Sequence, residues 1–432
     1  MQTYEQINTG FNRQMLGGQR DRVKFLRRIL TRLGNPDQRF KIIHIAGTNG
    51  KGSTGTMLEQ GLQNAGYRVG YFSSPALVDD REQIKVNDHL ISKKDFAMTY
   101  QKITEHLPAD LLPDDITIFE WWTLIMLQYF ADQKVDWAVI ECGLGGQDDA
   151  TNIISAPFIS VITHIALDHT RILGPTIAKI AQAKAGIIKT GTKQVFLAPH
   201  QEKDTLVIIK KIAHQQRVGL TQADAQSIVD GKAILKVNRK IYEVPFNLLG
   251  TFQSENLGTV VSVFNFLFQR GLVPSCQPLI STLATVKIAG RMQKIADHPP
   301  IILDGAHNPD AAKQLTKTIS KIPHNKVIMV LGFLADKNIS QMVKIYQQIA
   351  DEIIITTPDH PTRALEASAL KSALPQAIIA DNPQKGLVMA KKIAEPNDLI
   401  VVTGSFYTIK DIEANLDDVV CKIKLEKIKS HL

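Results

Sequence analysis

The sequence predicts an α/β protein of two domains, each built around a parallel β-sheet. The chain has 432 residues, which is too long for one ordinary core and more typical of two domains. Short β-branched runs alternate with amphipathic segments of helical length, as in repeated βαβ units. Residues 288–300 combine glycine, polar residues and paired prolines, which indicates a domain boundary. We therefore expect domains of 1–294 and 295–432.

Composition excludes several classes of protein. Hydrophobic residues make up 44% and charged residues 21% of the chain, an ordinary globular balance. The cysteines at 142, 276 and 421 are odd in number and lack C-x-x-C spacing, so we expect neither a disulfide framework nor a zinc site. No stretch approaches the ~18 continuous apolar residues of a membrane span. We expect a soluble, cytoplasmic protein without a membrane partner.

The net charge of +8 fits anionic ligands, and nucleic acid is the rival explanation. The basic residues are spread along the chain, apart from a cluster at Lys422, Lys424, Lys427 and Lys429 that alternates with apolar residues. We interpret this cluster as a solvated face. Because a basic stripe with interleaved aromatic residues is absent from the sequence, we expect no nucleic-acid partner.

The stretch from Lys41 to Gly66 carries the strongest chemical signal. An amphipathic helix at 21–33 leads into a β-branched run, and this strand runs into a glycine-rich turn and a helix. The turn frees backbone N–H groups to surround a phosphate, while Lys51 adds a cation and Ser53 a hydroxyl for Mg²⁺. The strict G-x-x-x-x-G-K-[ST] pattern is not met, because Ile45 replaces its first glycine. A glycine turn that binds nothing is the alternative. We predict a large phosphate-loop NTPase-like domain with a parallel-sheet core.

Three further strands of this domain end in polar residues, where an open parallel sheet presents its ligand contacts. The strand at 69–72 runs into Ser74. The next ends in Glu141, followed by a glycine loop, and an acid at this place is the usual way to hold Mg²⁺ near a phosphate loop. Its alternative role is a strand-capping carboxylate. A third strand ends in Asp168 and His169, which suggests a second metal position, although a lone histidine is more often structural.

The remaining segments of the first domain are predicted mainly as scaffold. The aromatic helix at 117–130 belongs to the core, but Glu120 within it is hard to explain there. Lys184 ends a helix at 177–185, and by pattern alone it is a surface residue. Residues 217–247 indicate an added β-hairpin, and 251–269 a helix with Asn256 near its start.

Strands and helices alternate again beyond residue 300, which predicts a smaller Rossmann-like domain. Its first strand ends in the stretch from Asp304 to Pro309, and its last strand runs into Ser405 and Phe406. Because both domains have polar strand ends, we expect a ligand cleft between them.

Taken together, these motifs resemble the folylpolyglutamate synthase and dihydrofolate synthase family, within the Mur-ligase group of ATP-dependent amide ligases. The resemblance spans nearly the whole chain. It is carried by ten stretches in the family's order, namely HIAGTNGKGS at 44–53, SSPAL at 73–77, ECGLGGQDDATN at 141–152, HIALDHTRILG at 164–174, AKAGIIK at 183–189, AGRMQ at 289–293, LDGAHNPD at 303–310, ADKN at 335–338, TRAL at 362–365 and TGSFY at 403–407.

The resemblance implies an enzyme that uses ATP and Mg²⁺ to join L-glutamate to folate, and possible action on dihydropteroate, through an acyl phosphate. The nucleotide contacts that it implies are Gly47, Thr48, Asn49, Gly50, Lys51, Gly52, Ser53, Asn256, Arg291, Asp304, His307 and Asn308. The implied metal ligands are Ser53, Ser74, Glu141, His169 and Lys184. Lys51, Lys184, Arg291 and His169 are the implied catalytic residues. Lys184 matches a lysine that the family carries as a carbamate, which reverses the surface assignment. We expect a monomer.

Several positions depart from the family pattern. Ala76, Gln147 and Ala183 replace a histidine, an arginine and a glutamate; Gln83 lies where the family often has arginine; Ala289 and Gln293 replace a proline and a glutamate. These differences put the choice of substrate in question more than the type of reaction. A ligase for another acid or amino acid therefore stays an alternative, as do a non-catalytic paralogue that binds folate and nucleotide, and a nucleic-acid-binding ATPase. Retention of the metal set disfavours the paralogue.

Overall fold

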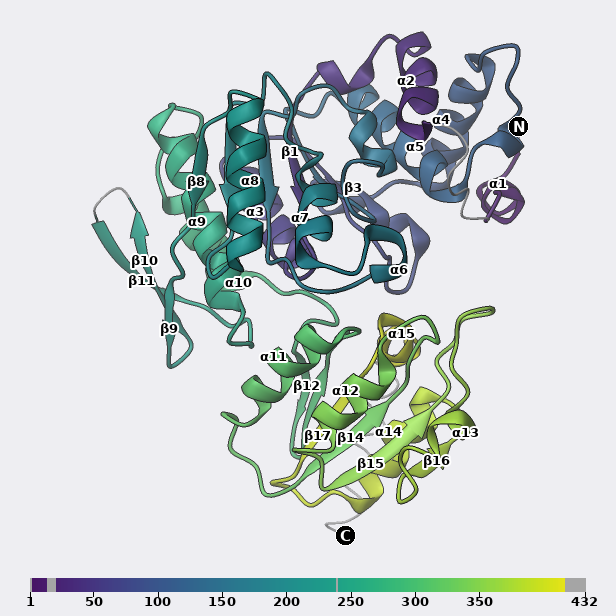
Figure 1. Ribbon diagram of the computed structural model, residues 1–432, viewed down its shortest axis with the longest axis vertical. Helices are drawn as coiled ribbons and strands as arrows, with labels where there is room; N and C mark the ends of the chain where they lie inside the picture. Colours follow the sequence, from purple (N-terminus) through teal and green to yellow (C-terminus); the bar gives the residue numbers. More distant parts are fainter. Residues whose placement is uncertain (1, 14–20, 238–239, 416–432) are drawn as a thin grey trace. The chain divides into compact units, whose positions relative to one another are not determined.

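The computed structural model describes residues 2–13, 21–237 and 240–415 (Figure 1). By its contacts the chain divides into two compact units. The first comprises the described residues up to Ala76, Asp80–Asn247 and Ser254–Val286; the second comprises Leu77–Asp79, Leu248–Gln253 and the described residues from Lys287 onward. The predicted limits of 1–294 and 295–432 stay predictions. The basic cluster at 422–429 lies outside the described residues.

An eight-stranded sheet forms the centre of the first unit. Its order is β4-β3-β2-β5-β1-β6-β7-β8. Neighbouring strands from β2 through β8 pair in parallel, and the β2–β3 and β3–β4 pairs are antiparallel. The strands are β1 (Lys41–Ala46), β2 (Val69–Phe72), β3 (Ile84–Val86), β4 (His89–Leu90), β5 (Trp137–Glu141), β6 (Ile159–Ile162), β7 (Gln194–Leu197) and β8 (Leu220–Gln222). The predicted α/β class with a parallel-sheet core is confirmed.

Helices pack against this sheet in separate clusters. The helices are α1 (Tyr4–Gly10), α2 (Arg22–Arg32), α3 (Lys51–Asn64), α4 (Lys93–Glu105), α5 (Ile118–Asp132), α6 (Thr170–Leu173), α7 (Ile177–Ala185), α8 (Lys203–Gln215), α9 (Gln253–Gln269) and α10 (Gln277–Thr285). Apolar side chains of α2, α4 and α5 form one core with β1, β2 and β5, and those of α7 and α8 form another with β6 and β7. α3 packs against β1, β2, β5 and α10. No helix among the described residues is both long and apolar enough to cross a membrane.

The predicted hairpin within residues 217–247 is present and carries a third strand. A separate antiparallel sheet has the order β11-β10-β9, with β9 (Ser227–Val229), β10 (Lys232–Val237) and β11 (Lys240–Pro245). Alternate residues of β10 are buried, because one face of this sheet is covered and the other is solvated.

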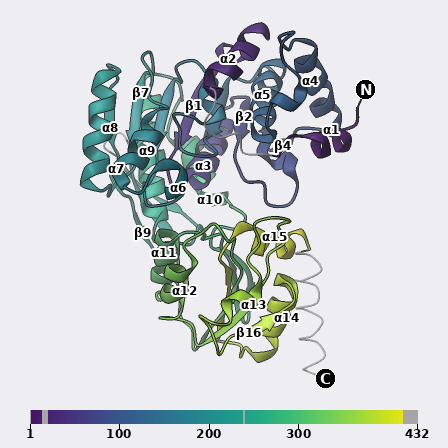
Figure 2. The same ribbon diagram turned by 45° about the vertical axis from the view of Figure 1, so that its right-hand side comes forward.

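The second unit is a six-stranded sheet with helices on both faces. Its order is β12-β13-β17-β14-β15-β16, and only the β12–β13 pair is antiparallel. The elements are β12 (Gln293–Asp297), β13 (Pro300–Leu303), α11 (Pro309–Ile319), β14 (Val327–Leu331), α12 (Ile339–Tyr346), β15 (Glu352–Thr356), α13 (Ala367–Leu370), β16 (Ile378–Ala380), α14 (Pro383–Ile393), β17 (Leu399–Thr403) and α15 (Phe406–Ala414). α11, α12 and α13 pack on one face and α14 and α15 on the other, as Figure 2 shows for α11, α12 and α14.

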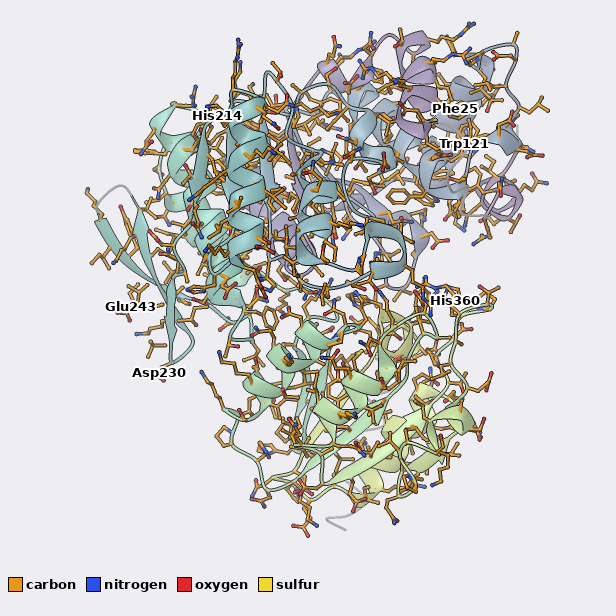
Figure 3. All side chains as sticks on the ribbon, in the orientation of Figure 1. Phe25, Trp121, His214, Asp230, Glu243 and His360 are labelled. Carbon is orange, nitrogen blue, oxygen red and sulfur yellow. The ribbon has the colours of Figure 1, made fainter. Side chains whose placement is uncertain are left out.

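The structure explains Glu120, the acid within the aromatic helix. Its two carboxylate oxygens accept hydrogen bonds from Arg22 of α2, at 2.7 Å from Nε and 2.5 Å from Nη2. The backbone N–H of Thr117 donates to the same carboxylate over 2.8 Å, which completes a capping box at the start of α5. Figure 3 labels Phe25 on α2 and Trp121 on α5, the helices that this ion pair joins. Glu120 is therefore a structural residue.

We expect the substitution Glu120→Ala to lower the free energy of unfolding of the first unit by about 3 kcal/mol, because it leaves the Arg22 guanidinium without its carboxylate in a largely buried setting. Urea unfolding followed by tryptophan fluorescence would measure this change, since the tryptophans at 121, 122 and 137 all lie in this unit. Lys24→Ala, at a side chain 86% exposed on the same helix, is the matched control and should change it by less than about 0.5 kcal/mol. Equal unfolding midpoints for the two variants would contradict the assignment.

Candidate functional site

The turn between β1 and α3, together with the first three residues of α3, forms a tightly enclosed segment, Gly47–Ser53, that we call the phosphate loop. A Cβ at Gly47 would lie 1.8 Å from Thr163 Oγ1, and one at Gly50 would lie 2.2 Å from Asn256 Oδ1. Gly50, with φ of 89°, is also the residue before the first turn of α3. Only glycine fits both positions, and the helix start with its positive dipole end suits an anion. The loop thus brings Asn256 of α9 against the predicted phosphate site.

The loop is anchored to the end of β6. The backbone N–H groups of Thr48 and Asn49 donate to the carbonyl of His164, over 2.8 Å and 3.2 Å, and Thr48 Oγ1 donates to the carbonyl of Ala166 over 3.0 Å. These bonds fix the course of the loop. The structure therefore gives Thr48 and Asn49 an anchoring role, and their predicted contact with a nucleotide stays a prediction.

A buried acid and a lysine face each other at the start of α3. Glu141, 3% exposed at the end of β5, lies opposite Ile45 in the sheet register. Its Oε1 is 3.6 Å from Lys51 Nζ, which also donates to the carbonyl of Thr48 over 3.3 Å. Ser53 is buried in the same helical turn. A cation, a carboxylate and a hydroxyl are thus held together at one end of the phosphate loop.

Lys184 is buried, so the surface position predicted from its pattern alone is wrong. It is 5% exposed, and its Nζ donates to the carbonyl of Gly47 over 2.6 Å. Burial, together with the charge of Lys51, lowers the pKa of Lys184 to about 7. The loop after β5 packs against the end of α7, the helix that carries Lys184. Gly146 has no room for a Cβ against the Lys184 backbone, and Gln147 N donates to the carbonyl of Ala183 over 2.7 Å. An amine that is easily deprotonated therefore sits beneath the phosphate loop.

Ser74, Glu141, the phosphate loop and His169 follow the ends of β2, β5, β1 and β6, which are four neighbouring strands of the sheet. Ser74 is half-buried. His169 has a left-handed backbone with φ of 49°, and its N–H donates to Asp168 Oδ1 over 2.8 Å. The sheet thus gathers the predicted metal residues on one edge.

These donors fit a small divalent cation. Among the described residues, no group of three or more histidine, cysteine, aspartate or glutamate side chains could hold a metal by itself. Hydroxyl oxygens of Ser53 and Ser74 with the buried Glu141 carboxylate are the hard ligands that Mg²⁺ prefers, and Mg²⁺ commonly completes its shell with phosphate oxygens and water. The assignment of these ligands stays a prediction.

A buried polar network under the site was missed from the sequence. His44 Nε2 of β1 lies 2.9 Å from Thr151 Oγ1 and 3.1 Å from Cys142 Sγ. Thr151 also bonds Asp149 Oδ1 over 2.5 Å, and Asp149 Oδ2 accepts from Leu144 N over 2.7 Å. Burial and the charge of Lys189 lower the pKa of His44 to about 3, so its ring is neutral. The network ties β1 to the glycine loop after β5, and its residues lie within the motif stretches 44–53 and 141–152.

Two of the predicted residues of the second unit, Arg291 and His307, lie beside Phe406. The Arg291 guanidinium lies 4.2 Å from the centre of the Phe406 ring, and the His307 ring lies 6.1 Å from it. Asp304, buried at the end of β13, accepts from Met292 N and Ala306 N over 2.9 Å each, and burial raises its pKa against the opposing effect of Arg291. Asn308 accepts from Ala311 N over 2.9 Å and caps α11. Phe406 was missed as a site residue, although it lies in the TGSFY motif.

The departures from the family pattern occupy different settings. Gln147 is exposed on the loop over Lys184, where it is available to a ligand. Gln293 is used internally, because its Oε1 accepts from Gly290 N over 2.6 Å and its Nε2 donates to Glu413 over 3.0 Å. Gln83 donates to the carbonyl of Asp80 over 3.1 Å. Of the departures, Gln147 and Ala289 are exposed, while the others are partly buried.

We expect Gly50→Ala to weaken nucleotide binding at least tenfold, because its Cβ would displace the Asn256 side chain and open the phosphate loop. Gly66→Ala is a matched control: its φ is 91°, similar to the 89° of Gly50, but no atom lies within 4 Å of the added Cβ. The control should lose about 1–2 kcal/mol of stability through backbone strain alone, with unchanged binding. Calorimetric titration with a nucleotide and thermal melting measure the two effects. Equal affinities of the two variants for the nucleotide would refute the steric argument.

Comparison with known proteins places the chain in a family. The Mur ligase middle domain matches residues 45–264, and the Mur ligase, glutamate ligase domain matches residues 290–406. Dihydrofolate synthase/folylpolyglutamate synthase of Bacillus subtilis is 32% identical over 406 residues, covering 90% of this chain and 94% of that protein. Folylpolyglutamate synthase of Lacticaseibacillus casei is 32% identical over 412 residues, with coverage of 90% and 94%.

Solved structures agree with these matches. Escherichia coli FolC in complex with DHPP and ADP superposes with a TM-score of 0.85 at 27% identity, covering 96% of this chain and 98% of that one. A bifunctional folylpolyglutamate synthase/dihydrofolate synthase solved with Mn, AMPPNP and L-glutamate bound gives a TM-score of 0.80 at 29% identity, with coverage of 91% and 94%. The family predicted from the ten motifs is confirmed: the chain belongs to the folylpolyglutamate synthase and dihydrofolate synthase family of Mur ligases.

Proposed function

We propose that the protein is an ATP-dependent ligase that joins the amine of L-glutamate to a carboxylate of folate, and that dihydropteroate is a second acceptor. The observation that carries this proposal is the set of groups at the ends of β2, β5, β1 and β6: a cation and a buried acid at the phosphate loop, with a lysine of lowered pKa beneath it. A protein that only bound nucleotide would not need this acid and this lysine together.

The similar proteins support the choice of substrates. The FolC structure was solved with DHPP and ADP, and a bifunctional folylpolyglutamate synthase/dihydrofolate synthase with Mn, AMPPNP and L-glutamate. The present chain covers more than nine tenths of each of these two chains, and its own phosphate loop and strand-end acid suit ligands of this kind. We infer that it uses ATP with a divalent metal, and a pterin acid and L-glutamate as the two substrates to be joined.

The reaction follows from the charges of these groups. A carboxylate acylates an amine only after one of its oxygens becomes a good leaving group. Attack of that oxygen on the γ-phosphorus of ATP gives an acyl phosphate and ADP, and the glutamate amine then attacks the acyl carbon and releases phosphate. Lys51 would offset negative charge on the transferring phosphoryl group, and Arg291 would add a second cation. Bound Mg²⁺, held by Ser53, Ser74, Glu141 and His169, would supply further positive charge to the phosphate oxygens.

A second candidate function is the ligation of a different acid or amino acid. The observation that favours it is Gln147, an exposed residue over Lys184 where the family has arginine. Loss of a cation at that place would alter the affinity for an anionic substrate without removing any residue assigned to ATP. Monomeric state, cytoplasmic location and the absence of a nucleic-acid partner stay predictions.

Phosphate release from MgATP should require both L-glutamate and a pterin acid. The measurement compares dihydropteroate, tetrahydrofolate and no acceptor, each with and without L-glutamate. Release with either pterin only in the presence of glutamate supports the proposed reaction and identifies the acceptor. Tight ATP binding without turnover on both pterins would overturn it, and turnover with another amino acid would favour the second candidate.

We expect Lys184→Ala to lose most of the activity while ATP still binds, and added bicarbonate should not restore turnover. With a pKa of about 7, about half of the Lys184 amines are neutral at pH 7, against about 1 in 3,000 for an ordinary lysine, and only the neutral amine takes up CO₂. A ¹³C carbamate resonance should therefore appear in the wild-type enzyme, weaken as the pH falls below 7, and be missing from Lys184→Ala.

The exposed Lys193 provides the control for this experiment. Lys193→Ala should keep both the activity and the carbamate resonance. Full activity of Lys184→Ala would show that the carbamate assignment is wrong.

A further inference from the structure

Tyr71 of β2 places a buried hydroxyl against the first turn of α3. The residue is 5% exposed, and its hydroxyl donates to the carbonyl of Gly52 over 3.3 Å. Thr56 Oγ1 lies 3.4 Å from the same oxygen. Burial and the charge of Glu141 raise the pKa of Tyr71, so the hydroxyl keeps its proton. A neutral hydroxyl is thus fixed beside the residue that precedes Ser53.

Gly55 makes this placement sterically possible. A Cβ at Gly55 would lie 2.8 Å from the Tyr71 hydroxyl oxygen and 3.0 Å from its Cε2. Glycine inside a helix costs about 1 kcal/mol relative to alanine, and Gly55 lies well inside α3 at a helical turn that needs no special backbone conformation. Its absent side chain is therefore explained by the tyrosine ring that fills the space.

The Tyr71 side chain belongs to the strand that leads to Ser74. Tyr71 lies in β2 three residues before Ser74, so its bond to Gly52 holds the end of this strand against α3. Ser73 is held as well, since its backbone N–H donates to the carbonyl of Gln83 over 3.3 Å. One side chain therefore connects the helical turn that carries Ser53 with the strand end that leads to Ser74.

We propose that Tyr71 is a positioning residue for the metal site, which sets the spacing of the Ser53 and Ser74 hydroxyls by tying the end of β2 to Gly52 in the first turn of α3. The inference rests on the proposed function only in taking these two serines as metal ligands. Tyr71 touches neither substrate nor metal in this scheme. Its removal should weaken the affinity for the cation and change the chemical step little, because the phosphate loop, Lys51 and Glu141 keep their own contacts.

Tyr71→Phe is the direct test, because the ring still fills the space at Gly55 and only the hydroxyl is lost. We expect the Mg²⁺ concentration for half-maximal activity to rise about tenfold, with kcat at saturating Mg²⁺ reduced less than threefold. Calorimetric titration of Mn²⁺ into the enzyme with AMPPNP should show the same tenfold loss of affinity. This binding measurement does not depend on turnover, so absent turnover with pterin and glutamate would count against the proposed function alone.

Tyr67→Phe is the matched control. The Tyr67 hydroxyl lies in the same unit but donates to the carbonyl of Leu272, which belongs to neither the turn that carries Ser53 nor the segment that carries Ser74. Its loss should lower the melting temperature without changing the affinity for Mn²⁺. If Tyr71→Phe behaves in the same way, with lower stability and wild-type metal affinity, its role is only structural and the inference is overturned.

Gly55→Ala gives a second, independent variant. Its Cβ should push the tyrosine ring away and reproduce the loss of metal affinity. Because the two substitutions act through one contact, the double variant Gly55→Ala with Tyr71→Phe should lose little more affinity than either single variant. Losses that simply add in the double variant would contradict a shared contact.

Discussion

The lack of space around the phosphate loop is the constraint on which the rest of the site depends. Gly47 lies against Thr163 of the β6 end, and Gly50 lies against Asn256 of α9, each too close for a Cβ. The loop therefore has its shape only when β1, β6 and α9 are packed in their native places. This close approach also brings Lys184 to the Gly47 carbonyl. The loop is shaped by its surroundings as much as by its own glycines.

The parallel sheet brings the other predicted site residues to the phosphate loop. Strand order places β2, β5, β1 and β6 side by side, although the segments that follow them are up to about a hundred residues apart in sequence. Parallel strands end on the same edge, so their polar ends meet whatever their separation along the chain. Polar contacts then hold the ends in place: the His44 and Thr151 network under the loop, and the hydrogen bond from Tyr71 to Gly52.

Charge balance explains why buried ionisable groups are tolerated here. Glu141 is paired with Lys51, while Lys184 is close enough to Lys51 for its own charged form to be disfavoured. A neutral Lys184 avoids two cations in one buried space, since an isolated buried charge is costly. In contrast, Arg22 and Glu120 form a complete ion pair with hydrogen bonds on both oxygens and serve the fold alone.

The sequence by itself determined the α/β class, the strands with polar ends and the family, because strand periodicity, glycine turns and motif order are local properties of the chain. It could not decide the state of single side chains. Lys184 looked exposed from its helical pattern and Glu120 looked out of place. The contacts of Tyr71, His44 and Phe406 could not be predicted, although His44 and Phe406 lie in the family motifs, since their partners lie elsewhere in the sequence. Burial, pKa and steric contact depend on those distant partners, and only the tertiary structure supplies them. The phosphate loop illustrates both contributions. Its glycines can be seen in the sequence, but the contacts that require glycine there are seen only in the tertiary structure.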